Sequence, residues 1–317
     1  MLSPHALGVT LSLGTAFLWA LSPLFWASAG RRIGSVATNL LRILLASAVL
    51  LLVVLPAYAL LLGRWPAMPA PVQFGWMLLS GTAGLVIGDA FFFAAVVHLG
   101  PRRAVQLNTL APVSAVLLGW TFLDEELAAP VLAGVALVLG AVAYIAFAER
   151  RPVPADDGDP PSTEPGHMSR WGLTCAICSA ACVGMGTVLG RQAFRAPGPP
   201  FDPVVATVVR VAGACPQLWA FALLRGTARP MLRHLRDRAI LHRLCLGVLA
   251  GPVGGMLCYV TSMKLIPAGL VSTLTAMSPL VILPIVAVYY RARVRPGVYL
   301  ATAAAVAGVA LLFWDRR

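Results

Sequence analysis

Long apolar runs separated by short polar gaps make up most of this sequence. Ten runs are each about 20 residues long, the length at which an α-helix crosses a hydrocarbon core of about 30 Å. The pattern therefore predicts an all-α integral membrane protein with ten transmembrane helices. The predicted helices are Ala6–Ala27, Val36–Leu61, Phe74–Val97, Val105–Phe122, Ala128–Phe147, Trp171–Gly190, Val204–Leu224, Leu244–Met263, Gly269–Tyr290 and Gly297–Trp314.

The one long polar stretch runs from Glu149 to Arg170 and is rich in Pro, Asp and Ser. Such a composition cannot form a packed core, which predicts a disordered linker. The linker, 149–170, separates a first five-helix unit, 1–148, from a second one, 171–317.

The two units have the features of copies. Arg42 corresponds to Arg210 at an offset of 168 residues, and Pro112 to Pro279 at an offset of 167. Gly84 and Gly251, also 167 apart, and Pro101 and Pro267, 166 apart, follow the same register. Because five is an odd number of spans, the second copy is predicted to enter the membrane upside down, as an inverted repeat.

The predicted helices contain glycines four residues apart, which allow helix backbones to approach closely. We interpret them as helix-packing seams rather than as a phosphate-binding loop, which would need a lysine and a following helix N-terminus. They are Gly84, Gly88, Gly186, Gly190, Gly247, Gly251 and Gly255.

Composition agrees with the apolar pattern. Apolar residues make up 59% of the chain and charged residues 11%, and the mean hydropathy is +0.83. A net charge of +12 is compatible with nucleic-acid binding, but the basic residues fall in the short gaps between spans, where they set topology and contact anionic headgroups. No HExxH or GxSxG segment and no intramembrane cluster of acids is present, so we expect no enzyme, cofactor or metal site.

The Arg and Lys residues in the gaps between spans predict how the protein is oriented in the membrane. The side that holds the termini carries six Arg and Lys residues, and the opposite side carries sixteen. The positive-inside rule therefore predicts termini that face out. The segment Arg225–Arg243 contributes most to this count, and it is interpreted either as a basic interfacial helix on the cytoplasmic surface or as an ordinary arginine-rich loop.

Two predicted spans carry a central proline and many polar side chains, in corresponding positions of the two units. Membrane helices tolerate such kinks where neighbouring helices or a cavity satisfy the freed backbone groups. Their polar groups are predicted to bind a substrate, with weaker candidates near the end of the first helix. The candidates are Gln106, Asn108, Thr109, Pro112, Ser272, Thr275, Ser278 and Pro279, with Trp19 and Ser22 as the weaker ones.

Three ionisable residues lie well within predicted spans: Arg42, Asp89 and Arg210. A charge in the bilayer centre costs roughly 3 kcal/mol or more, so each needs a partner or a cavity. Arg42 and Asp89 fall at similar depths from the same side and are predicted to pair, which leaves Arg210 without an equivalent acid. The pair serves structure, or Asp89 couples transport to protons, or one arginine binds an anionic substrate group.

At this level of detail the chain resembles the EamA-type transporters of the drug/metabolite transporter superfamily, over nearly its whole length. The motifs that carry the resemblance are Trp19-Ala20-Leu21-Ser22, Arg42, Gly88-Asp89-Ala90-Phe91-Phe92, Pro112 and Leu123-Asp124-Glu125-Glu126-Leu127 followed by Gly134. Asp124 stands where the family usually has glycine, and Arg291-Ala292-Arg293 replaces the acidic turn in the second unit. The acidic turn is therefore interpreted as a feature of stability or topology.

The resemblance implies a secondary transporter in the cell (inner) membrane that exports or exchanges a small metabolite or drug-like solute by alternating access. It also implies cytoplasmic termini, against the charge count. The expected partners are the solute, the lipid bilayer and protons, and a ten-helix unit can act as a monomer. Two other hypotheses remain: an anion or nucleotide-conjugate exchanger of the same architecture, and a membrane scaffold or enzyme that transports nothing.

Overall fold

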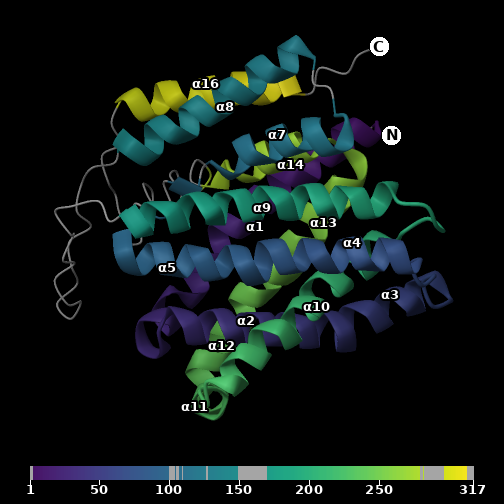
Figure 1. Cartoon of the computed structure of the whole chain (residues 1–317), viewed down its shortest axis with the longest axis vertical. Helices are drawn as coiled ribbons and strands as arrows, with labels where there is room; N and C mark the ends of the chain where they lie inside the picture. The colour runs from purple at the N-terminus through teal and green to yellow at the C-terminus, as the bar shows by residue number, and fades with distance from the viewer. Residues whose placement is uncertain are drawn as a thin grey trace.

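A computed structural model describes residues 3–99, 104, 107–108, 110–125, 128–148, 170–278, 281 and 296–312, and the regular structure in these residues is helical (Figure 1). The first unit contains α1 (Pro4–Ile33), α2 (Ser35–Val49), the π-helical η1 (Leu50–Val54), α3 (Leu55–Leu62), α4 (Pro71–Gly81), the π-helical η2 (Thr82–Gly88), α5 (Asp89–Leu99), α7 (Ala111–Leu123) and α8 (Ala129–Ala148). The second unit contains α9 (Arg170–Arg195), α10 (Pro203–Leu224), α11 (Ala228–Arg233), the 3₁₀ turn η3 (His234–Arg236), α12 (Arg238–Val248), the π-helical η4 (Leu249–Gly255), α13 (Met256–Leu265), α14 (Ala268–Thr275) and α16 (Pro296–Leu312).

Within the described residues, six helical stretches are long and apolar enough to cross a bilayer. They are Pro4–Ser22, Val36–Leu62, Pro71–Leu99, Arg170–Arg195, Pro203–Leu224 and Arg238–Leu265, and they correspond to the first, second, third, sixth, seventh and eighth predicted spans. Two shorter apolar helices, Ala111–Leu123 and Ala129–Ala141, fall in the fourth and fifth predicted spans. Much of the ninth predicted span lies outside the described residues, so the total of ten stays a prediction.

The outer surface of the bundle is apolar, as a lipid-facing surface requires. Leu60, Leu61 and Leu224 are more than four-fifths exposed, and many other large apolar side chains point outward. In water such a surface would be an aggregation hazard, but against acyl chains it costs nothing. The interior holds large apolar side chains such as Leu41 and Met263 together with small and polar ones, including the buried hydroxyls of Ser12, Thr187 and Ser262.

The third stretch of each unit is interrupted by a π-helical segment at the same place. Thr82–Gly88 separates α4 from α5, and Leu249–Gly255 separates α12 from α13, 167 residues later in the chain. Each π segment widens one turn and leaves backbone carbonyls without their usual α-helical partners, a feature that is frequent at functional sites. Gly84 and Gly251, which correspond in sequence, therefore both lie in a π-helical segment.

The helices pack reciprocally between the two units. The third stretch of the first unit, α4–η2–α5, packs against α9 and α10, and the third stretch of the second unit, α12–η4–α13, packs against α1 and α2. Equivalent helices also pack on each other: α2 on α10, α7 on α14, and α8 on α16, the last pair at the top of Figure 1. Each unit thus completes its core with the first two spans of the other.

Glycine makes the closest of these contacts possible. A Cβ atom on Gly186 of α9 would lie 3.0 Å from the carbonyl oxygen of Ser80 and 3.1 Å from the backbone nitrogen of Gly84. Gly81, at the end of α4, faces the backbone of Arg210 on α10 even more closely. The predicted packing role is confirmed for Gly84 and Gly186, because the two units meet there backbone to backbone.

We expect Gly81→Ala to lower the thermal stability of the protein in detergent. The added methyl group would overlap the carbonyl oxygen of Arg210, and such overpacking typically costs about 1–3 kcal/mol. Gly75→Ala is the matched control, because Gly75 lies on the same helix and a methyl group added there would meet nothing within 4 Å. The control should keep or raise the melting temperature. Equal shifts in both variants would contradict the packing of α4 on α10.

Candidate functional site

The first of the two spans with a central proline, Val105–Phe122, is interrupted by a turn just before Pro112, as the sequence predicts. Leu110 forms a turn, and α7 begins at Ala111 with the buried Pro112 in its first turn, where a proline needs no backbone donor. Asn108 lies directly before this break. Its Oδ1 atom is buried and has no hydrogen-bond partner within the described part of the chain. The kink therefore leaves an unsatisfied acceptor beside it, whereas the neighbouring candidates Gln106 and Thr109 lie outside the described residues.

The second proline-containing span breaks at the corresponding place. Helix α14 ends at Thr275 and is followed by a turn at Ala276 and Met277; Pro279 lies outside the described residues. The candidate Thr275 donates to the carbonyl of Val271 at 2.9 Å, and Ser278 donates to that of Thr275 at 2.8 Å. Ser272 is buried. The hydroxyls of Thr275 and Ser278 therefore bond to their own helix, and either would have to exchange that bond in order to bind a solute.

The weaker candidates on α1 lie beside a tyrosine that sequence reasoning missed. The ring of Trp19 lies 5.0 Å from that of Tyr259 on α13, centroid to centroid, and Ser22 is buried one turn further along. The hydroxyl of Tyr259 lies 2.6 Å from that of Thr187 on α9. Because Trp19 belongs to the first unit and the other two to the second, this aromatic cluster lies at the seam between the units.

Arg210 occupies the same seam and is 2% exposed. Its guanidinium carbon lies 5.4 Å from the centroid of the Tyr259 ring, and Nη1 donates to the hydroxyl of Ser80 and, at 3.0 Å, to the carbonyl of Gly186. Within the described residues it forms no ion pair, and its Nε has no hydrogen-bond partner. The expectation that Arg210 lacks an acid stays a prediction, because it also concerns residues outside this part of the chain.

Arg42 and Asp89 pair as predicted. Nη2 of Arg42 lies 2.8 Å from Oδ2 of Asp89, and its Nε donates to Oδ1 of Asn39 at 2.6 Å. The register of the π segments also identifies Met256 as the residue equivalent to Asp89, since each directly follows the π-helical turn. The paired side chains keep 24% and 19% of their surface exposed, which is considerable for charges inside predicted spans.

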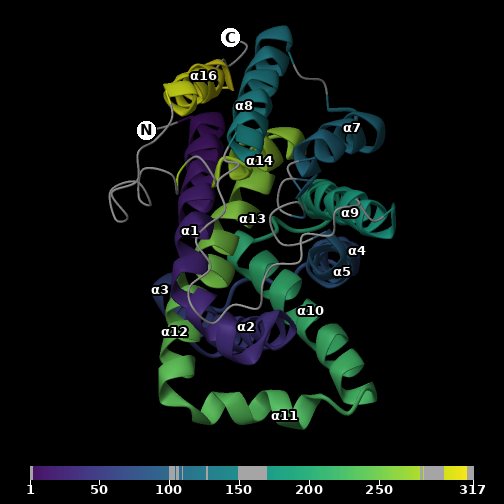
Figure 2. The ribbon, with the colours of Figure 1, turned by 90° about the vertical axis from the view of Figure 1, so that its left-hand side faces the viewer.

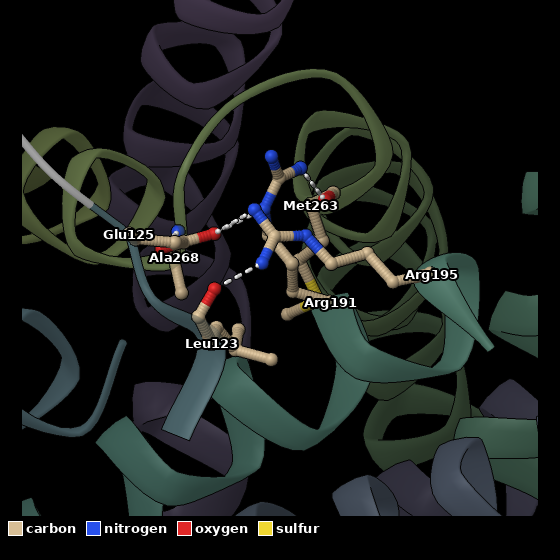
Figure 3. A network of polar contacts seen from close by, with 6 residues as sticks. All are labelled: Leu123, Glu125, Arg191, Arg195, Met263 and Ala268. Carbon is tan, nitrogen blue, oxygen red and sulfur yellow. Dashed lines mark hydrogen bonds and ion pairs between the residues drawn. The ribbon is translucent and has the colours of Figure 1, made fainter. Parts of the chain in front are cut away.

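A second charged cluster, the Glu125 clasp, joins the units where α9 ends (Figure 3). The Glu125 side chain is 4% exposed; its Oε1 lies 2.5 Å from Nε of Arg191 and 3.3 Å from Nη2 of Arg195, and its Oε2 accepts from the backbone of Ala268 at 2.9 Å. The two arginines also donate to the carbonyls of Met263 and Leu123, at 2.6 and 2.5 Å. The carboxylate thus caps the N-terminus of α14 and neutralises one of two converging arginines.

The clasp changes the interpretation of its residues. From sequence, Arg191 and Arg195 counted as loop charges that set topology, but α9 continues through both of them. Their spacing of four residues places them on one helix face, which is the signal that could have identified a shared acidic partner. Nothing in the sequence singles out Tyr259, because an aromatic residue within an apolar span has no distinctive pattern.

Asp124 stands where the family usually has glycine, and its backbone conformation accounts for that preference. Its φ of 49° places it in the left-handed region at the C-terminal cap of α7. Glycine adopts this conformation without strain, and aspartate is among the few residues that tolerate it. The turn at Asp124 thus has a conformation that glycine also adopts, and it orients the following Glu125 toward Arg191 of α9.

The model of the EamA-like transporter family matches residues 6–147 and again residues 170–314. The chain belongs to the EamA-like transporter family. The family consists of membrane transporters of small solutes, and its two matches fall on either side of the linker segment.

Solved structures share the fold of this EamA-like transporter. One crystal structure covers 96% of the chain and is itself covered to 96%, with 20% sequence identity and a TM-score of 0.68. At that identity the likeness shows the fold alone. A comparison with curated proteins finds no significant match.

We expect Glu125→Gln to destabilise the transporter, because it leaves the largely buried Arg191 without its counter-charge. Breaking a buried ion pair on one side costs about 3 kcal/mol. Asp124→Asn is the matched control: it removes the same charge from the adjacent, exposed residue, and asparagine also tolerates the left-handed conformation. Thermal unfolding in detergent measures both variants. A Glu125→Gln variant as stable as the control would show that the clasp contributes little.

Proposed function

We propose that this EamA-like protein is a secondary active transporter of the cell (inner) membrane that exports or exchanges a small metabolite or drug-like solute. The observation that carries the proposal is Arg210, a buried cation without an acid in the described residues, which bonds across the seam from α10 to Ser80 of α4. A dry structural core has little use for such a group, since a buried charge is costly. A polar solute held between the units would complete its hydrogen bonding.

We further propose that the two units are inverted repeats that rock about this seam. The shared position of η2 and η4, 167 residues apart, supports a duplication. Reciprocal packing, in which each third span contacts the first and second spans of the other unit, supports a two-fold relation between them. An odd number of spans per unit then requires opposite insertion, the arrangement used for alternating access.

The positions of the charged contacts between the units support a state that is held closed more firmly on one side. We call the face where α1 begins and α9 ends the terminal face, and the face where α9 begins the linker face. Near the terminal face the units are joined by the Glu125 clasp and by hydrogen bonds from Tyr58 to Asp202 at 2.7 Å and from Gln73 to Pro199 at 3.0 Å. Towards the linker face the units are also joined, by hydrogen bonds from Trp219 to the carbonyl of Leu40 at 3.3 Å and from Ser179 to that of Gly88 at 2.9 Å. Among the described residues no ion pair crosses between the units there, because the Arg42–Asp89 pair stays within one unit. Solute access is therefore proposed to open at the linker face, where only neutral contacts hold the described parts of the units.

The charge at the seam constrains the solute. Asp89 neutralises Arg42, which leaves Arg210 as the uncompensated positive charge among the described residues of the candidate site. One arginine suits a neutral solute, or a zwitterionic solute with a single acidic group, whereas a strongly anionic solute needs several arginines. The aromatic pair of Trp19 and Tyr259 favours a modestly amphipathic solute.

Uptake and efflux of a solute panel in proteoliposomes, with and without a proton gradient, test the proposed function. Arg210→Gln should abolish uptake of those solutes that carry an acidic group, while the matched substitution of the exposed Arg64, Arg64→Gln, should leave it unchanged. Failure of every solute to cross the membrane in either direction would favour the hypothesis of a non-transporting scaffold. Preferential exchange of phosphorylated or dicarboxylate solutes would favour the anion exchanger, the second candidate that an uncompensated Arg210 supports.

Asp89 is the proposed site of proton coupling. If the second and third spans of the first unit shift against each other during transport, Arg42 moves away from Asp89, and a carboxylate that loses its counter-charge within the membrane takes up a proton. We therefore expect Asp89→Asn to flatten the pH dependence of transport. Asp237→Asn is the control, because Asp237 caps α12 at the protein surface, and asparagine caps equally well. An unchanged pH profile in Asp89→Asn would rule out the coupling role and leave the pair a structural one.

A further inference from the structure

The connection between α10 and α12 contains a short helix that runs in a different direction from the spans. Helices α5 and α9 run across Figure 1 and are seen close to end-on in Figure 2, whereas α11 runs across Figure 2 at the bottom of the molecule. Helix α11 therefore lies steeply across the direction of those spans. That is the orientation of a helix at a membrane surface, one of the two alternatives that the sequence left open.

The segment formed by α11 and η3 has two distinct faces. Its inner face consists of Ala228, Met231 and Leu235, which pack into two small apolar clusters with residues of α2, α10 and α12. This face fixes the segment on the bundle. Its outer face carries the residues at the alternate helical positions, and they line an open hollow of about 240 Å³. The lining residues are Arg229, Leu232, Arg233 and Arg236.

The three arginines of the hollow are exposed, and within the described residues none of them forms an ion pair. The nearest acid in sequence, Asp237, forms no ion pair with them; it caps α12, where its Oδ1 accepts from the backbone of Ala239 at 2.9 Å and of Ile240 at 3.3 Å. The other titratable neighbours, His234 and Arg238, are not acidic, so they cannot neutralise the hollow. Three arginines therefore line the hollow without an ion-pair partner in this part of the chain.

Leu232 identifies the kind of ligand. It lies among the arginines and is 41% exposed, so the hollow combines three basic side chains with apolar surface. A soluble phosphate compound gains nothing from an exposed leucine. A membrane phospholipid satisfies both features, because its phosphate can accept hydrogen bonds from arginine while its acyl chains contact the leucine.

We propose that the face formed by Arg229, Leu232, Arg233 and Arg236 is a binding site for the headgroup of an anionic phospholipid. The lipid anchors the segment between α10 and α12 to the membrane surface. This proposal does not depend on the transported solute, and it would stand if the protein proved to transport nothing.

Native mass spectrometry of the protein released from mixed micelles tests the site, with phosphatidylglycerol and phosphatidylcholine supplied in equal amounts. The unaltered protein should retain phosphatidylglycerol preferentially. The triple variant R229Q/R233Q/R236Q should lose that preference, with an affinity that falls roughly fivefold for each arginine removed. The control triple R32Q/R64Q/R170Q removes the same charge from exposed arginines elsewhere and should retain the lipid.

Several results would overturn the proposal. If both triple variants retained the same amount of phosphatidylglycerol, the three arginines of the hollow would contribute no more than other exposed charges. Displacement of the lipid by millimolar inorganic phosphate would assign the hollow to a soluble phosphate compound. Should the triple variant fail to fold, the single variants R233Q and Leu232→Ser provide the same comparison, and retention unchanged in both would equally exclude the site.

Discussion

Hydrocarbon offers no water to a buried charge, so each ionised group within this bundle needs partners from the protein or from a bound solute. The structure meets this constraint in three ways. Asp89 satisfies Arg42 inside one unit, Glu125 satisfies Arg191 across the two units, and Arg210 is held by neutral oxygens and the face of an aromatic ring. These three solutions differ in how easily the units can separate, because only the last two join one unit to the other.

The small residues at the seam serve the same constraint. Where Gly84 and Gly186 bring the backbones of η2 and α9 together, Ser80 comes within reach of both the carbonyl of Gly186 and the guanidinium of Arg210. A larger side chain at either glycine would push the helices apart and leave the guanidinium with fewer acceptors. The hydrogen bonding of Arg210 at this seam therefore depends on the close packing of the helices.

Much of the fold could be read from the sequence, and the candidate site only in part. Apolar run length is sufficient to locate the spans around α2, α10 and α13, because crossing a bilayer imposes a fixed length. The pairing of Arg42 with Asp89 also follows from depth along two neighbouring helices. Depth within one unit, however, says nothing about contacts between units. The clasp on Glu125 and the contact of Trp19 with Tyr259 depend on how the units pack, for which a single sequence holds little signal.

The two arginines at equivalent positions have different partners, and this difference bears on the direction of the proposed motion. Arg42 and Arg210 occupy corresponding positions, but the residue after the π-helical turn is Asp89 in the first unit and Met256 in the second. Arg42 therefore has an acid within its own unit, while Arg210 must bond across the seam to Ser80. In a perfectly symmetric pair, both faces would close through the same contacts and with the same free energy. Because one acid is missing, separating the units at Arg210 exposes an uncompensated charge, whereas separating them near Arg42 does not. For the proposed rocking motion, this single difference between the repeats would make the two directions unequal.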